Sequence, residues 1–171
     1  MAQIQRVYRR HQQLGLPGQV FHAAEAYAFD QGIAGVALVP GDGVYYDATT
    51  DRWIKPTDAA TRLLVTHVVG FDASSFNTDI SSPTLNQSSQ VTYAAGDLIK
   101  VMAYGTIIVV AGEDIVANQD LVYYNHADGR WEVYTGTAGT IGTFRAAVFE
   151  AITSGGDGDP IGIRHYGRAQ R

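Results

Sequence analysis

One stretch of the sequence decides the fold, and it reads VYYDATTDRW over residues 44–53. A second stretch, VYYNHADGRW over residues 122–131, matches the first without a gap and is identical to it at five of ten positions. The two tryptophans of the chain occupy equivalent places in these stretches. A repeat of this kind indicates a duplicated structural unit.

Each copy of the repeat predicts a β-hairpin. Val-Tyr-Tyr favours a strand, the Asp, Asn, Thr, Ala and Gly residues favour a turn, and Arg-Trp begins the return strand. We expect the Trp and one Tyr of each copy to pair across the strands. A further strand is predicted after each hairpin, at residues 62–69 and 144–152. The sequence therefore predicts a mainly β body of two related hairpin units, in which the second hairpin closes a barrel or sandwich with the first.

Turn residues divide the rest of the chain. A strand at residues 36–39 is predicted to end in the turn Pro40-Gly41-Asp42-Gly43. Residues 98–103 and 106–110 flank Tyr104-Gly105 and predict another hairpin. The Ser-, Asn- and Asp-rich residues 72–90 predict a long polar loop. We expect three parts: an N-terminal arm at residues 1–19, a β domain at 20–153 and a C-terminal tail at 154–171.

Composition and charge narrow the class of protein. The 171 residues fit one domain or two small fused units, and the absence of cysteine excludes disulfides and thiolate metal sites. No apolar run has the length of a signal peptide or a membrane span, so we expect a soluble chain without a secretion signal. The net charge is −5, yet both chain ends carry arginines and no acid. The acidic body disfavours nucleic acid, and the basic ends are either frayed polar termini or arms for acidic surfaces.

The search for catalytic and metal motifs predicts no enzyme, no cofactor and no metal site. The chain contains no G-x-S-x-G, H-E-x-x-H or phosphate-binding glycine motif. Its five histidines are dispersed, and His67 is expected to be a satisfied core or interface residue. Residues 154–160 resemble a calcium-binding glycine-aspartate repeat, but Pro160 stands where that repeat needs an acid. We expect an acidic turn there.

The aromatic residues of the repeat raise an alternative function. Aromatic faces can stack on sugar rings, so Tyr45, Trp53, Tyr123 and Trp131 are candidate platforms of a carbohydrate-binding module. We expect these side chains instead to pack the hairpins together.

The chain also resembles a known family, the capsid cement or head decoration proteins of tailed bacteriophages. The resemblance rests on the Gly-rich run at residues 32–44, its weaker echo at residues 112–122, short strands separated by Gly and Pro, and the basic N-terminal arm. The lack of cysteine and of catalytic motifs also fits. The doubled hairpin is not part of the resemblance.

This resemblance implies a β-barrel-like or β-tulip body on the outer surface of a phage head. It implies a homotrimer that bridges neighbouring major capsid proteins, without a cofactor and without contact to nucleic acid or membrane. Another β-rich virion component, from the tail or the head-completion complex, is the alternative beside the carbohydrate module. The residues that we predict to contact the capsid or a partner are Arg6, Tyr8, Arg9, Arg10, Arg164, His165, Tyr166 and Arg168.

Overall fold

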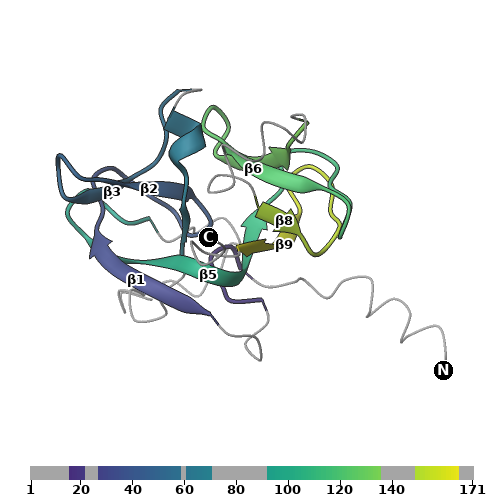
Figure 1. The fold of residues 1–171 in the computed structure, drawn as a ribbon, viewed down its shortest axis with the longest axis horizontal. Helices are drawn as coiled ribbons and strands as arrows, with labels where there is room; N and C mark the ends of the chain where they lie inside the picture. Colours follow the sequence, from purple (N-terminus) through teal and green to yellow (C-terminus); the bar gives the residue numbers. More distant parts are fainter. Residues whose placement is uncertain (1–15, 22–26, 59–60, 71–91, 136–148, 166–171) are drawn as a thin grey trace, which may run out of the picture.

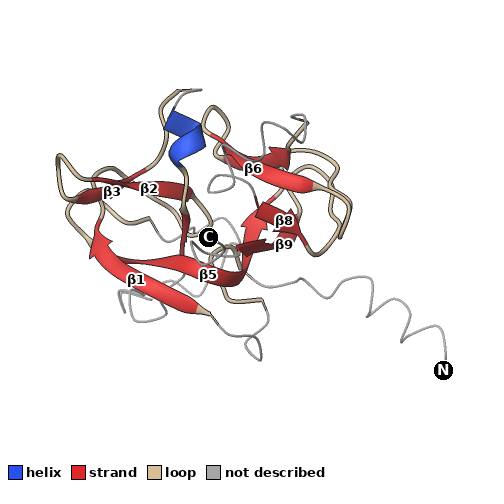
Figure 2. Cartoon of the chain, in the orientation of Figure 1, coloured by secondary structure: helices blue, strands red, loops and turns tan. Residues whose placement is uncertain are grey.

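The strands of the protein form one antiparallel sheet. The computed structural model describes residues 16–21, 27–58, 61–70, 92–135 and 149–165, which contain the strands and one short 3₁₀ helix, η1 at Thr61–Leu64 (Figures 1 and 2). The strands are β1 Ala28–Ile33, β2 Gly43–Asp47, β3 Arg52–Ile54, β4 His67–Val69, β5 Leu98–Val110, β6 Leu121–Asn125, β7 Arg130–Val133, β8 Phe149–Ala151 and β9 Pro160–His165. The prediction of a mainly β fold is confirmed.

The strand order places β5 at the centre of the molecule. Neighbouring strands follow the order β3-β2-β4-β5-β9-β8-β6-β7, and β1 pairs separately with β5. The sheet curls into a half-barrel, with β1, β2 and β3 toward one end and β6, β8 and β9 toward the other (Figure 1).

Both copies of the sequence repeat form hairpins with the same register. Tyr46 lies opposite Trp53 across β2 and β3, and Tyr124 lies opposite Trp131 across β6 and β7. In each pair the ring centroids are 5.5 Å apart and meet edge to face. The prediction that Trp pairs with one Tyr across the strands is confirmed.

The duplication extends well beyond the hairpins. Ala34 and Ala111 occupy equivalent positions. Ala34 donates its N–H to the carbonyl of Asp97, and Ala111 donates its N–H to the carbonyl of Asp159. Each alanine carbonyl then accepts from the glycine before that aspartate, at 2.8 and 2.9 Å. We therefore define a first unit of β1, β2, β3, β4 and the first half of β5. The second unit comprises the second half of β5, β6, β7, β8 and β9.

Strand β5 belongs to both units. Its residues 98–104 pair with β1, and its residues 105–110 pair with β9. The predicted hairpin at Tyr104-Gly105 is wrong, since the strand runs straight through this dipeptide. Gly105 has a φ of 123°, and a Cβ there would lie 2.6 Å from Cβ of Tyr27. The glycine permits a close backbone approach at the junction of the units and does not mark a turn.

Two further strand predictions are wrong in part. Residues 62–64 lie in η1, because the Asp58 carboxylate accepts from the N–H of Thr61 at 2.7 Å and begins a helical turn there. Only His67–Val69 of that predicted strand joins the sheet. Among residues 36–39, Leu38 alone forms an isolated bridge, to Tyr93. The predicted strand at 144–152 is found at Phe149–Ala151, and its first part lies outside the described residues.

The expected chain ends contribute to the sheet. Residues 160–165, which we placed in a C-terminal tail, form β9 between β5 and β8. Ile161, Gly162 and Ile163 are buried there, so the tail begins no earlier than residue 166. Residues 16–21, partly in the expected N-terminal arm, run along β5. The N–H of Gly18 donates to the carbonyl of Ile108 at 2.7 Å, and the N–H of Phe21 donates to that of Thr106 at 2.9 Å.

The buried side chains form two clusters that follow the units. The cluster of the first unit contains Ala34, Leu38, Val44, Trp53, Val69, Tyr93, Ile99 and Val101. The larger cluster contains their counterparts Ala111, Ile115, Val122, Trp131, Ala151, Ile161 and Ile163. It also takes in Tyr124 and Phe149 of the second unit and Val65, Val68 and Met102 of the first. The second unit therefore carries the main core.

Candidate interaction surface

A turn of the first unit covers the second hairpin. The hydroxyl of Tyr124 donates to Oδ1 of Asp42 at 2.7 Å, and the indole N–H of Trp131 donates to the carbonyl of Gly41 at 2.9 Å. Both hydrogen bonds are buried. We name Val39–Asp42 the first turn and its counterpart, Val116–Asp120, the second turn. The first turn thus fixes the units against each other through polar contacts inside the core.

The environment of Asp42 raises its pKa. Burial is the main cause, and it outweighs the opposing effects of the Val39 N–H, the Tyr124 hydroxyl and the Lys55 ammonium 4.0 Å away. Burial, with the nearby Asp42 carboxylate, likewise raises the pKa of the Tyr124 hydroxyl. The hydroxyl therefore stays a hydrogen-bond donor.

Among the described residues, no turn covers the first hairpin in this way. Tyr46 is 48% exposed, whereas its counterpart Tyr124 is 1% exposed. The Tyr46 hydroxyl donates to Asp51 in its own hairpin. Within the described part of the chain, the Trp53 indole N–H has no hydrogen-bond acceptor. A pocket of about 480 Å³ lies over this hairpin, lined by Asp30, Gln31, Gly32, Ile33, Tyr46, Asp51 and Trp53.

Apolar side chains are exposed at the two ends of the β1–β5 pair. Ile33 lies opposite Leu98 at one end of the pair, and Tyr104 lies opposite Ala28, next to Tyr27, at the other. Leu98 is 67% exposed, and Ile33, Tyr27 and Tyr104 are each at least 40% exposed. We name these four residues the apolar face. The corresponding strand segment of the second unit is lined by residues 16–21, with a bridge from Val20 to Ile107.

Two buried histidines lie where the units meet. His67 is bonded through Nε2 to Oδ2 of Asp30 at 3.1 Å and through Nδ1 to the hydroxyl of Thr66 at 2.8 Å, so the prediction of a satisfied buried histidine is confirmed. His165 packs on Phe149, with ring centroids 4.7 Å apart. Burial, and secondarily the charge of His67, lowers the pKa of His165 to about 4. His165 is therefore neutral at physiological pH.

Six of the eight predicted contact residues lie outside the described ranges: Arg6, Tyr8, Arg9, Arg10, Tyr166 and Arg168. Of the other two, Arg164 lies 3.7 Å from the carboxylate of Glu150, across β8 and β9. His165 is buried, and its position favours a role in packing. A partner contact by these residues stays a prediction. The exposed residues Leu98 and Tyr104 lie within β5, where buried Met102 interrupts the alternation that could have indicated an exposed side from the sequence.

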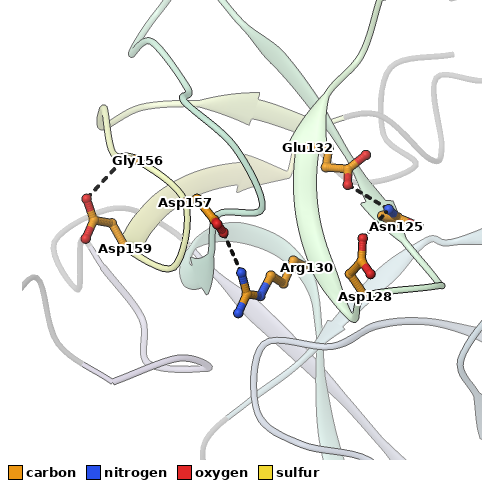
Figure 3. Close-up of polar contacts among 7 residues, drawn as sticks. All are labelled: Asn125, Asp128, Arg130, Glu132, Gly156, Asp157 and Asp159. Atoms are coloured by element: carbon orange, nitrogen blue, oxygen red, sulfur yellow. Dashed lines mark hydrogen bonds and ion pairs between the residues drawn. The ribbon is translucent and has the colours of Figure 1, made fainter.

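Both aspartates of the acidic turn at residues 155–160 have partners within the protein. Asp157 pairs with Arg130 of β7, and Asp159 accepts from the N–H of Gly156 at 2.9 Å (Figure 3). Near the hairpin turn, the side-chain amide of Asn125 donates to Glu132 at 2.6 Å and to Asp128 at 3.1 Å. Among the described residues, no group of three or more His, Asp or Glu side chains is arranged to hold a metal ion.

The geometry does not favour sugar platforms on the hairpins. Trp131 is fully buried, and Trp53 is 7% exposed. The hydroxyl of Tyr123 donates to Glu132 at 2.7 Å, which ties that ring to its own hairpin. The aromatic side chains pack the hairpins, as the sequence analysis preferred. No helix in the described ranges has the length and apolarity that a membrane span requires.

Comparisons with known proteins point to phage heads. The family described as structural cement protein (E217 gp24/Pam3 gp6) matches residues 4–165. A solved structure, the head fiber gp8.5 N base of bacteriophage phi29, is similar with a TM-score of 0.50 and 14% sequence identity, over 82% of this chain and 94% of that chain. At this identity the likeness shows the fold alone. No curated protein sequence matches the chain.

Proposed function

This chain belongs to the phage structural cement protein family, and on that premise we propose that it binds the head through the apolar face of β1 and β5. As a member of the family it is a structural protein of the virion that is associated with the capsid and stabilises it. The proposal concerns the surface that makes the contact. The carbohydrate-binding and tail-protein alternatives are not favoured by this membership.

The exposure of Leu98, Ile33, Tyr27 and Tyr104 supports the proposal. Adjacent exposed apolar groups mark interaction sites, and here they form two pairs, Ile33 with Leu98 at one end and Tyr27 with Tyr104 at the other. Aromatic residues are also enriched in interface cores. The apolar face is therefore suited to a partner surface with apolar pockets.

We propose that the C-terminal basic end lies beside Tyr104 and that the N-terminal basic end lies near the second half of β5. His165, the last residue of β9, pairs with Gly105, so the chain continues toward Tyr166 and Arg168 from a point next to Tyr104. Arg6, Tyr8, Arg9 and Arg10 precede the segment 16–21 that runs along β5. These residues would extend the contact onto neighbouring capsid subunits by charge-assisted hydrogen bonds. The repeated contacts of a homotrimer on the outer capsid surface would add avidity.

We further propose that the protein acts without catalysis and without a cofactor. Cementing requires only binding. The major capsid protein is the expected partner.

A binding assay with undecorated heads of the parent phage tests the apolar face. Leu98→Glu and Tyr104→Ala are each expected to weaken binding at least about tenfold, because hot-spot side chains commonly contribute more than about 1 kcal/mol. The matched control is Leu64→Glu, since Leu64 is 51% exposed but lies in η1, away from the face. Co-sedimentation with heads over a concentration series gives the affinity. Unchanged binding by both face variants would reject the proposal.

A truncation separates the arm from the face. Deletion of residues 1–15 leaves the segment 16–21 on β5. Circular dichroism is therefore expected to show that the sheet stays folded. We expect this protein to bind heads more weakly and with a shallower dependence on salt, because three arginines are lost. Full binding with an unchanged salt dependence would remove the arm from the contact.

A further inference from the structure

Strand β1 has an inner edge that is paired and an outer edge that is open. The inner edge pairs with β5, and directly after β1 the chain meets β3, where Ala34 forms a bridge with Trp53. Within the described part of the chain, no strand pairs with the outer edge of β1 over residues 29–32 (Figure 1). An open strand edge is a template for pairing with another polypeptide.

The register of β1 and β5 shows which backbone groups face the open edge. The carbonyl of Lys100 in β5 accepts from the N–H of Gly70, so the backbone polar groups of Lys100 point away from β1. Gln31 lies opposite Lys100. Two residues placed in this way exchange no hydrogen bonds in an antiparallel sheet, so the N–H and the carbonyl of Gln31 both point outward. Neither group has a backbone partner among the described residues.

The same edge of the second unit is occupied. Ile108 is the counterpart of Gln31 in the registers of the two units. Its N–H donates to the carbonyl of Gln19 at 2.9 Å, and its carbonyl accepts from the N–H of Gly18 at 2.7 Å. The segment 16–21 is thus added to the edge of the second unit, whereas the matching place on the first unit is open.

The pocket over the first hairpin lies along this open edge. It is lined by residues 30–33 of β1 and by Tyr46, Asp51 and Trp53 of the hairpin. Trp53 is 7% exposed, and its indole N–H has no acceptor among the described residues. A Cβ on Gly32 would collide with Nε1 of Trp53, which places this donor beside the β1 backbone. An extended segment on β1 would bring a carbonyl within reach of the indole N–H.

The carboxylates of the pocket favour a basic side chain on that segment. One oxygen of each carboxylate, Oδ1 of Asp30 and Oδ2 of Asp51, has no partner among the described residues. In the second unit, Val20 of the added segment forms a bridge with Ile107, whose counterpart is Asp30. A residue of a partner segment at the place of Val20 would therefore face a carboxylate. Opposite charges across a strand pair stabilise the pairing.

We propose that the open edge of β1 binds an extended segment of the capsid protein, and that an arginine or lysine of this segment enters the pocket beside Asp30 and Asp51. The segment pairs with Gln31 as the segment 16–21 pairs with its counterpart, and one of its carbonyls accepts from Trp53. Main-chain hydrogen bonds supply affinity in contacts of this kind, and side-chain pockets supply specificity. The inference rests on the proposed function only in taking the head as the source of the segment.

A backbone substitution tests the edge by co-sedimentation with undecorated heads. Gln31→Pro removes the outward N–H and places a ring where the partner strand approaches, and proline is tolerated on an edge strand whose nitrogen faces solvent. We expect binding to weaken at least about tenfold. Gln31→Ala is the matched control, because it keeps the backbone N–H and is expected to bind as the wild type does.

A second substitution tests the basic side chain. Asp51→Asn removes one charge of the pocket and fits the turn, since Asn tolerates the positive φ of 57° at this position. We expect weaker binding to heads and a shallower dependence of the affinity on salt. An unchanged salt dependence would exclude a basic group beside Asp51.

Hydrogen exchange measures the edge without any substitution. The N–H of Gln31 should exchange rapidly in the free protein, and bound heads should slow its exchange at least about tenfold, because a partner carbonyl then accepts from it. Mass spectrometry of peptides that cover residues 28–33, from free and from head-bound protein, gives both rates. Residues 121–133 of the second hairpin are the internal control and should exchange alike in both states.

The outcomes separate this inference from the proposed function. Full binding by Gln31→Pro, with binding lost in Leu98→Glu, would leave the apolar face as the contact and overturn the inference. Unchanged exchange over residues 28–33 on bound heads would overturn it as well. Protection that appears without heads and rises with protein concentration would assign the edge to a second copy and exclude the capsid segment. Wild-type protein that does not bind heads would reject both proposals.

Discussion

The two hairpins share a sequence motif, a register and an edge-to-face Tyr–Trp pair, yet the tyrosine of one is buried and the tyrosine of the other is 48% exposed. The difference comes from outside the hairpins, because Gly41 and Asp42 of the first turn cover only Tyr124 and Trp131. The motif therefore determines the hairpin, and the neighbouring unit determines its environment. In this duplicated chain, the contact between a turn of one unit and the hairpin of the other forms only once, so the two units are unequal.

The buried side chains at equivalent positions of the two units also differ. Phe149 and Ile107 of the second unit have His67 and Asp30 as counterparts in the first, where the two polar side chains bond to each other at 3.1 Å. At these two positions the covered unit has apolar side chains, and the unit whose face is open has a polar pair. The two polar groups of that pair satisfy each other, which lowers the cost of burying them.

The largest expected difference between the hairpins concerns their tryptophans. Trp131→Ala is expected to lower the free energy of unfolding by about 4 kcal/mol, because it empties the main core and removes a buried hydrogen bond. Trp53→Ala should cost about half as much, since Trp53 lies in the smaller cluster and its indole N–H has no acceptor among the described residues. Urea denaturation followed by circular dichroism measures both. Equal decreases in the free energy of unfolding for the two variants would show that the two tryptophans contribute equally, and would contradict this comparison.

The pH dependence of stability should report on the second unit through His165. Its pKa is lowered to about 4 in the folded protein, against an ordinary value of about 6.5. The unfolded chain therefore binds a proton first as the pH falls, and stability is lost between about pH 6.5 and pH 4. The loss approaches about 3 kcal/mol.

The variant His165→Leu isolates this effect. Asp42, whose pKa is raised, works in the opposite sense, because its folded form gains stability as acid protonates it. The difference between wild type and variant cancels that contribution. Parallel stability curves for the two proteins from pH 7 to pH 4 would show that His165 is not the titrating group.

Removal of one hydroxyl compares the two tyrosines directly. Tyr124→Phe leaves Oδ1 of the buried Asp42 without its donor and should cost about 2 kcal/mol. Tyr46→Phe should leave the melting temperature unchanged, since its hydroxyl is on the surface. Thermal melts of both variants decide the matter. A loss for Tyr46→Phe similar to that for Tyr124→Phe would show that the first hairpin is covered.

The smallest effect is expected at the equivalent turn residues Asp51 and Gly129, whose φ values are 57° and 68°. Gly129→Asp should destabilise the protein by about 1 kcal/mol, because a side chain disfavours this conformation. Asp51→Gly should change stability less. Chemical denaturation of both variants would check the order, and the reverse order would mean that the turns are not equivalent.

The sequence predicted those parts of the fold that depend on local pattern. The two hairpins and their Tyr–Trp pairs were found because VYY and RW recur without a gap. The remainder of the duplication was not found, since residues 71–92 of the first unit correspond to residues 153–154 of the second and break the alignment. Ala94-Ala95-Gly96-Asp97 and Gly156-Asp157-Gly158-Asp159 form the same turn and share only Gly-Asp.

Glycine serves several purposes in this chain, so its presence alone does not predict a turn. Gly105 lies within a strand, where it permits a close approach to Tyr27. The Gly- and Asp-rich run before Pro160 concealed the beginning of β9. The covering of Trp131 by Gly41 could not be predicted either, because such a contact depends on how the two units pack and leaves no periodic signal.

The sharing of β5 has a consequence for how the protein comes apart. The first unit uses residues 98–104 of this strand and the second uses residues 105–110, with no linker between them. Neither unit can melt without fraying a strand that the other needs. We therefore expect one cooperative transition, without a half-folded intermediate. A protein under sustained outward force would then hold or yield as a whole.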